Sequence, residues 1–146
     1  MASLYNSEGY FSPTEYEALK RVEREERAAE KSAAFRPIVY ICSPYSHGCI
    51  NTNIEKARKY SRFAVNKHYL PITPHIYFTQ FMDDTVSEER ETAVFMNFVL
   101  MSKCVELWVF GDTISAGMKA EIERAERKHM KIRYFTEELE EKKCEI

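Results

Sequence analysis

From residue 37 onward, short apolar runs alternate with longer segments of helical periodicity, and this alternation limits the possible folds more than any other feature. The runs are rich in β-branched and aromatic residues, as buried strands are. They occupy residues 38–42, 69–74, 105–110 and 131–135. Between them, apolar residues recur at three- and four-residue spacing over residues 52–67, 87–103 and 117–129. Strands that alternate with helices predict an α/β domain at residues 37–146, a Rossmann-like open parallel sheet of four to five strands with helices on both faces.

Two shorter segments of this domain have a less regular pattern. Residues 75–86 are aromatic and then acidic, which predicts a loop or a short helix leaving the sheet. After the last apolar run, Thr136 can cap a final short helix that reaches about residue 142.

Residues 1–36 differ in composition and form a separate N-terminal extension that we expect to be partly helical. Ser12 is a suitable N-cap, Pro13 suits the first helical position, and Glu15 lies three residues after the cap. Residues 16–34 are rich in Glu, Arg, Lys and Ala, with only a thin apolar stripe. The pattern fits a solvated helix slightly better than a helix that docks on a partner subunit.

Composition excludes several classes of protein. The chain has 146 residues, enough for one ordinary domain, and its 21 Lys and Arg against 23 Asp and Glu give a net charge of −2. This balance argues against binding a nucleic acid polymer, which requires a strongly basic surface. No apolar run approaches the roughly 18–20 residues that span a bilayer, and the N-terminus lacks a signal pattern. We therefore expect a cytoplasmic protein that does not bind membranes.

The cysteines give no pattern of a metal site. There are four, none in a C-x-x-C pair: Cys42, Cys49, Cys104 and Cys144. Cys42 and Cys104 lie in apolar runs, which predicts core positions. Because the spacing fits no standard zinc motif, we expect no metal and no cofactor.

Parallel sheets place their ligand sites outside the carboxyl ends of the strands, so two loops matter most. These are residues 43–51, after the first strand, and residues 111–117, after the third. Neither contains G-x-G-x-x-G or a Walker A sequence, and the chain has only four glycines. The usual dinucleotide and P-loop sites are therefore excluded.

The second loop ends where a helix is predicted to begin. Ser115, Gly117 and Met118 would present free backbone N–H groups there, which together with the helix dipole form an anion site. Glu121 lies about one turn into the helix and can face the same crevice. Ordinary helix capping by Ser115 and a favourable dipole interaction of Glu121 already explain both residues, and from the residues alone this is the better explanation.

The first loop carries further polar side chains. Tyr40 lies on the first strand and is followed by Ser43 and Tyr45. If the first and third strands are neighbours, the Tyr40 hydroxyl approaches the Glu121 carboxylate. His75, at the end of the second strand, can contact a base or a phosphate, or can be a purely structural histidine.

Other polar residues leave alternatives open. Asp83 and Asp84 can bind a cation but fit a solvated turn better. Glu89 and Arg90 can pair with each other or reach the pocket. Trp108, inside the third strand, is predicted to belong to the core.

Three segments together resemble the nucleoside 2-deoxyribosyltransferase-like superfamily, which includes the 2'-deoxynucleoside 5'-phosphate N-hydrolases. They are residues 39–43, the pair Pro74-His75, and the motif Ser115-x-Gly117-x-x-x-Glu121. Residues 106–112 and 117–123 look closest to an uncharacterised branch of small phage and bacterial domains. The resemblance covers about residues 37–135.

This resemblance implies a flavodoxin-like sheet in which Glu121 attacks the anomeric carbon of a sugar and Tyr40 holds that carboxylate. Transferases of the family carry an Asp where this chain has Ser115, whereas the phosphate-handling hydrolases carry Ser. An Asp would repel a phosphate dianion and a Ser can donate to it, so the substrate implied is a nucleoside monophosphate. Family members usually carry an acid on the helix before the third strand. Here only Asn97 is polar in that neighbourhood, and the proton donor to the leaving base is unassigned.

The function expected from the sequence is therefore N-glycosidic bond cleavage, or deoxyribosyl transfer, on a (deoxy)nucleoside 5'-monophosphate. Glu121 and Tyr40 are the predicted catalytic residues. The predicted substrate-binding residues are Ser43, Tyr45, His75, Ser115, Gly117 and Met118. A non-catalytic nucleotide-binding or sensing module is the alternative, and a structural protein that assembles through residues 12–34 is a third. The resemblance also implies a homodimer or a higher homo-oligomer, and from their apolar and aromatic composition we expect residues 75–81 to form a contact.

Overall fold

The computed structural model describes residues 13–143 and divides the chain into two units, Met1–Phe35 and Arg36–Ile146. In the first unit, α1 (Pro13–Ala34) forms a helix of 22 residues that begins at the predicted proline. Its two large apolar residues, Leu19 and Val22, are about half exposed. The predicted cap Ser12 lies outside the described residues, as does Cys144.

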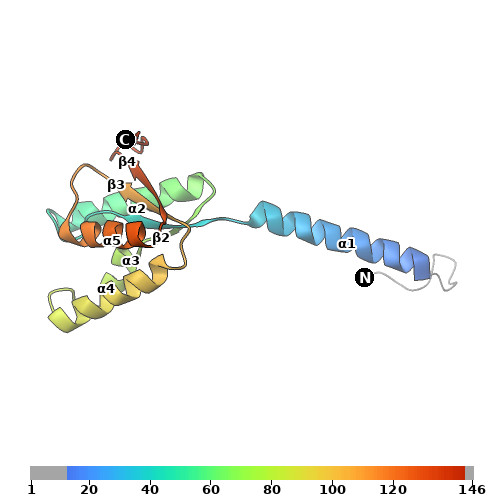
Figure 1. Cartoon of the computed structure of the whole chain (residues 1–146), viewed down its shortest axis with the longest axis horizontal. Helices are drawn as coiled ribbons and strands as arrows, with labels where there is room; N and C mark the ends of the chain where they lie inside the picture. Colours follow the sequence, from blue (N-terminus) through green and yellow to red (C-terminus); the bar gives the residue numbers. More distant parts are fainter. Residues whose placement is uncertain (1–12, 144–146) are drawn as a thin grey trace. The chain divides into compact units, whose positions relative to one another are not determined.

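The second unit is built on four parallel strands, which confirms the predicted sheet. The strands are β1 (Ile38–Cys42), β2 (Leu70–Ile72), β3 (Glu106–Phe110) and β4 (Lys131–Phe135). They are arranged in the order β2-β1-β3-β4 (Figure 1). Tyr40 pairs with Leu107, so the first and third strands are neighbours as expected.

Helices cover both faces of this sheet. They are α2 (Ile50–Asn66), α3 (Pro74–Tyr77), the 3-10 helix η1 (Phe78–Gln80), α4 (Ser87–Met101) and α5 (Ala116–Arg127). The sheet is therefore an open α/β sheet of the flavodoxin-like type. Residues 75–86 contain two short helical segments, in agreement with the sequence-based expectation.

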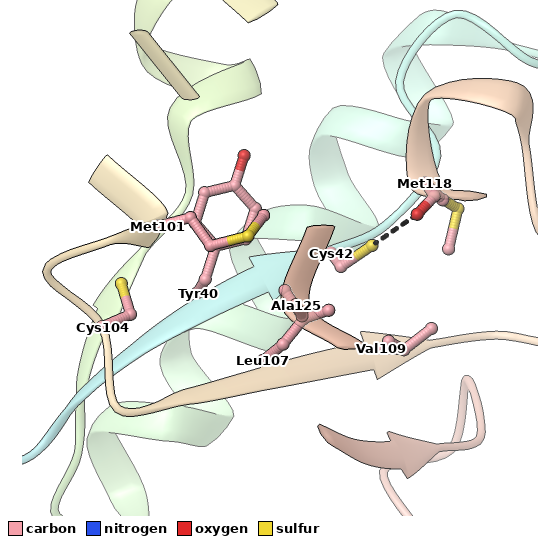
Figure 2. Packing of buried hydrophobic residues seen from close by; sticks show 8 residues of the cluster. All are labelled: Tyr40, Cys42, Met101, Cys104, Leu107, Val109, Met118 and Ala125. Atoms are coloured by element: carbon pink, nitrogen blue, oxygen red, sulfur yellow. Dashed lines mark hydrogen bonds between the residues drawn. The ribbon is translucent and has the colours of Figure 1, made fainter. Parts of the chain in front are cut away.

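Alternating residues of each strand enter two separate hydrophobic clusters, because successive side chains of a strand point to opposite faces. Tyr40 and Cys42 pack in the cluster that also contains Met101 of α4 and Met118 of α5 (Figure 2). Val39 and Ile41 of β1 pack with Tyr60 of α2, in a cluster that includes Trp108, Phe110 and Phe135. Cys42, Cys104 and Trp108 are buried, as predicted.

The structure differs from the sequence pattern in three places. The buried residues of α2 include Asn53 and Tyr60, which the apolar spacing over residues 52–67 does not single out. Val94 of α4 is 41% exposed, although it follows the apolar spacing of residues 87–103. Residues 136–142 form no helix: the chain turns back at Leu139, whose φ is 70°, and Glu141 bridges to Phe135. Leu139 packs against the second cluster, a contact that favours this turn over a helix.

The order of the strands determines where a ligand can bind. The chain passes from the central strand β1 to β2 at one edge of the sheet, and from the central strand β3 to β4 at the other edge. Between β1 and β3 the loops that follow the two strands therefore diverge, which opens a crevice at their carboxyl ends. In the described part of the chain, no helix is long and apolar enough to cross a membrane.

Candidate functional site

A cavity of about 450 Å³ opens at this crevice. The loop after β1, the segment from α3 to η1, helix α4 and the first turns of α5 contribute its walls. It is lined by seven of the eight residues singled out from the sequence: Ser43, Tyr45, His75, Ser115, Gly117, Met118 and Glu121. The structure thus brings together residues that lie up to 78 positions apart in the chain.

The eighth residue, Tyr40, lies behind the cavity in the core and contacts Glu121. The Tyr40 hydroxyl donates a hydrogen bond of 3.2 Å to Oε1 of Glu121. Tyr40 is only 1% exposed, and burial together with the Glu121 carboxylate holds its pKa well above the ordinary value of 10.0. The tyrosine therefore keeps its proton and acts as a fixed donor to the carboxylate.

Burial also changes the titration of Glu121. It raises the pKa of Glu121 from 4.5 to about 7, and hydrogen bonds from Cys42 and Tyr40 oppose this rise. Desolvation disfavours the charged form, whereas donors stabilise it. At neutral pH the ionised and protonated forms of this carboxyl are therefore both populated. Shifted pKa values of this kind are typical of acid–base and nucleophilic groups in active sites.

The start of α5 corresponds in part to the predicted anion site. Ser115 is the N-cap, and its Oγ accepts a hydrogen bond of 3.3 Å from the backbone N–H of Met118. The Met118 N–H is therefore already used, and its side chain is 2% exposed in the core, so its predicted role in binding an anion is weakened. The Ser115 hydroxyl proton and the Gly117 N–H remain as donors. A Cβ added at Gly117 would meet no atom within 4 Å, so the cavity is open at this position.

His75 and Ser43 form a polar pair in the cavity lining. Nε2 of His75 lies 3.1 Å from Oγ of Ser43, and the His75 ring meets the Tyr45 ring edge-on at 6.2 Å. Burial lowers the pKa of His75 from 6.5 to about 4, so the imidazole is neutral at physiological pH. The imidazole and the hydroxyl can each donate a hydrogen bond to a ligand or accept one from it, and neither group adds charge to the cavity.

Asn53 holds the loop after β1 in place. It is 8% exposed on α2, and its Nδ2 donates hydrogen bonds of 2.7 Å to the carbonyl oxygens of Tyr45 and His47. Both residues line the cavity. The sequence signal for this role is a polar residue on the inward face of a helix, which apolar spacing alone does not reveal.

Three further lining residues come from the segment before β3: Asp84, Arg90 and Asn97. Arg90 reaches the cavity and does not pair with Glu89, whose carboxylate accepts from the backbone of Asp83. Among residues 13–143, Arg90 has no carboxylate within ion-pair distance. Asn97 carries a buried Oδ1 without a hydrogen-bond partner, an arrangement that is rare unless a ligand or water completes it.

The residues described here include no group of three or more His, Cys, Asp or Glu side chains that could hold a metal ion. The arrangement offers one carboxylate of raised pKa, a helix N-terminus, an unpaired arginine and neutral polar groups. A cavity of this size with few convergent polar groups is typical of a site for a small molecule.

Comparison with known proteins gives a family without an assigned activity. The model of DUF7768, a domain of unknown function, matches residues 37–135. The chain belongs to this family. The matched region begins just before β1 and ends with β4, so it contains the whole sheet and every residue of the candidate site. No curated protein matches the chain. Membership in the nucleoside 2-deoxyribosyltransferase-like superfamily stays a prediction.

Proposed function

We propose that this DUF7768 domain cleaves the N-glycosidic bond of a (deoxy)nucleoside 5'-monophosphate, or transfers its sugar to a second base, with Glu121 as the nucleophile. The observation that carries the proposal is the position of the Glu121 carboxylate, in the cavity wall and 3.2 Å from a buried tyrosine hydroxyl. A nucleophilic carboxylate needs an orienting donor and access to the reacting carbon, and this arrangement offers both.

The reaction would proceed in two displacements. An oxygen of ionised Glu121 attacks C1' of the sugar, the bond from C1' to the base nitrogen breaks, and the base leaves with that electron pair and takes up a proton. Water or a second base then attacks C1', the bond to Glu121 breaks, and the carboxylate is regenerated. Two inversions give overall retention at the anomeric carbon.

The start of α5 supports a phosphate group on the substrate. The Ser115 hydroxyl and the Gly117 N–H are donors at the positive end of the helix dipole. Arg90 adds an unpaired positive charge to the same cavity, and guanidinium groups suit phosphate oxygens. With a phosphate held there, the sugar would lie close to Glu121, four residues further along α5.

The wall made by η1 and α4 suits the base. Phe78 of η1 and Phe98 of α4 offer apolar surface, and Asn97 offers an unused acceptor. Asp84 is the other carboxylic residue in the lining, so it is our candidate for protonating the departing base. The sequence pattern had favoured a solvated turn for this residue.

Release of free base tests the proposal. The full chain is incubated with each deoxynucleoside and ribonucleoside monophosphate, and free base is measured by chromatography. We expect release from at least one nucleotide, and none from Glu121→Ala, with circular dichroism showing that the variant is folded. Glu123→Ala, an exposed position on the same helix, is the matched control and should release base at the normal rate. Undiminished release by Glu121→Ala would exclude this mechanism.

A non-catalytic nucleotide-binding module is the second candidate, and one observation favours it. Members of the resembled superfamily usually carry an acid on the helix before the third strand. The corresponding part of α4 offers only the neutral Asn97. In this case a nucleoside monophosphate would raise the melting temperature through binding to the folded state, without any release of base.

Assembly into a homo-oligomer stays a prediction. Tyr77 and Phe81, in the segment expected to form a contact, are 62% and 61% exposed. Sedimentation analysis of the full chain and of a variant lacking residues 1–36 would separate assembly through the aromatic segment from assembly through α1. An unchanged oligomer after the deletion would exclude a role of α1.

A further inference from the structure

A second cavity, of about 490 Å³, lies at the opposite edge of the sheet from the candidate site. Its walls come from the last turn of α4, the residues between α4 and β3, the end of α5 and the residue before β4. Because these segments lead into β3 and β4, the second cavity is at the amino ends of those strands. The proposed reaction makes no use of it.

Most of the lining of the second cavity is apolar. Phe98, Met101, Val105 and Met130 contribute to it, and Met101 belongs to the cluster that Figure 2 shows. Val105 is 55% exposed, although it directly precedes the buried strand β3. Methionine side chains are unbranched and adapt to the shape of the group that they contact. The second cavity therefore offers an apolar surface that an apolar group of variable shape can cover.

Two cations in the same lining have no partner of opposite charge. Arg124 lies on α5 and Lys128 is its C-cap four residues later, so both lie on one face of the helix. Within residues 13–143 neither side chain takes part in an ion pair. The Arg124 Cζ lies 5.3 Å from the centre of the Phe98 ring, a contact that keeps the guanidinium against the lining. No acidic residue of the described part of the chain lines the second cavity.

The end of α5 does not use these two side chains as hydrogen-bond donors. Cations are favoured near the C-terminus of a helix, where they can also bond to its last carbonyl groups. Here the chain turns at His129, whose φ is 55°, and the backbone N–H groups of residues 128, 129 and 130 donate to the carbonyls of Arg124, Glu126 and Ala125. The backbone thus satisfies these carbonyls by itself. The helix dipole favours the two cations at this place but gives them no acceptor.

We propose that the second cavity binds a small organic anion with an apolar body, such as a medium-chain carboxylate. The anionic group would lie between Arg124 and Lys128, and the apolar body would cover Met101, Met130 and Val105. Two unpaired cations without an acid disfavour a cationic ligand, and the apolar surface around them disfavours an inorganic anion. The guanidinium fork of arginine matches the geometry of a carboxylate, and the volume is within the range of small-molecule sites.

Methyl NMR of the full chain, labelled with ¹³C at the methionine methyl groups, locates the ligand in the unmodified cavity. The probe is octanoate, and Met101→Leu, Met130→Leu and Met118→Leu identify the three signals. We expect octanoate to shift the Met101 and Met130 signals more than that of Met118, which lines the cavity of the candidate site. Larger shifts at Met118, or no shifts at all, would overturn the proposal.

Two further probes separate the apolar body from the charge. Octan-1-ol has the same chain without the charge, and acetate has the charge without the chain. Each should bind more weakly than octanoate by roughly tenfold or more, because each gives up one of the two interactions. Octan-1-ol that binds as tightly as octanoate would contradict the role of the cations, and acetate that does so would contradict the role of the apolar surface.

Substitution of the cations tests their contribution one at a time. Arg124→Gln and Lys128→Gln should each lower the affinity for octanoate by roughly three- to tenfold. Arg127→Gln, an exposed position on the same helix, is the matched control and should leave the affinity unchanged. An equal loss in Arg127→Gln would contradict specific binding by Arg124 and Lys128. If either variant fails to fold, salt dependence decides, since an affinity of the unmodified chain that is the same at low and high salt would exclude an ionic contact.

A second copy of the chain is the alternative occupant of the second cavity. Sedimentation analysis of the same variants distinguishes the two. If Arg124→Gln dissociates an oligomer and octanoate shifts no methyl signal, a second copy covers the second cavity and the proposal is overturned. None of these measurements involves release of base, so their failure would leave the proposed function untouched.

Discussion

Replacing Glu121 by glutamine removes a charge that the fold disfavours, and we predict a gain in stability that depends on pH. Burial raises the pKa of Glu121 from 4.5 to about 7. The folded chain therefore binds this proton more tightly than the unfolded chain does. Its stability falls as the pH rises from about 4.5 to about 7, and the whole penalty is present above pH 7. The rise in pKa corresponds to a penalty of about 3 kcal/mol, an upper limit because the side chain is only partly buried.

Glu121→Gln should recover most of this free energy at pH 8, because a glutamine carbonyl can still accept from Tyr40. For a domain of this size, about 3 kcal/mol corresponds to a melting temperature higher by roughly 10 °C. At pH 4.5 the two proteins should melt within a few degrees of each other. Calorimetry at both pH values measures this, with the exposed Glu123→Gln as control. A difference in melting temperature that is the same at both pH values would refute the reasoning.

Three further substitutions test separate parts of the site. Tyr40→Phe removes the donor to Glu121, so kcat/KM for base release at pH 7 should fall by roughly five- to tenfold and recover partly at higher pH, where Glu121 ionises without help. Gly117→Ala meets no atom of the folded chain and should leave the melting temperature unchanged or slightly higher, but calorimetric titration should show weaker nucleotide binding if a phosphate approaches this backbone. Asn97→Leu removes the buried acceptor without a partner, so the free energy of unfolding in urea should rise by roughly 1 kcal/mol, while nucleotide affinity should fall.

The fold was largely predictable because its strands and helices have distinct periods. The runs at β1 and β3 are predominantly apolar, with Glu106 as the one charged residue, as expected for strands buried on both faces, and the parallel order followed from their alternation with helices. The end of the domain was not predictable in the same way. A capping threonine and a polar segment fit a helix, but the burial of Leu139 against the sheet is a tertiary contact that no local pattern contains.

The positions of residues around the cavity were predictable where the residues follow strands, and were not where side chains reach across helices. Tyr40 and Glu121 were paired in advance because neighbouring parallel strands bring their carboxyl ends together. The roles of Asp84 and Arg90 were left undecided, because the direction of α4 and of the residues before it relative to the crevice depends on packing. The use of the Met118 N–H by Ser115 follows from the capping role that the sequence already indicated for Ser115, because an N-cap side chain accepts from the N–H two or three residues on.

The stereochemistry of sugar transfer tests the central claim most directly. With an active nucleotide and methanol as acceptor, ¹H NMR of the methyl glycoside 5-phosphate reports the configuration at the anomeric carbon. A covalent intermediate on Glu121 predicts the β-anomer of the starting nucleotide, because two displacements retain configuration. Formation of the α-anomer would show a single displacement by the acceptor and would contradict a nucleophilic role of Glu121.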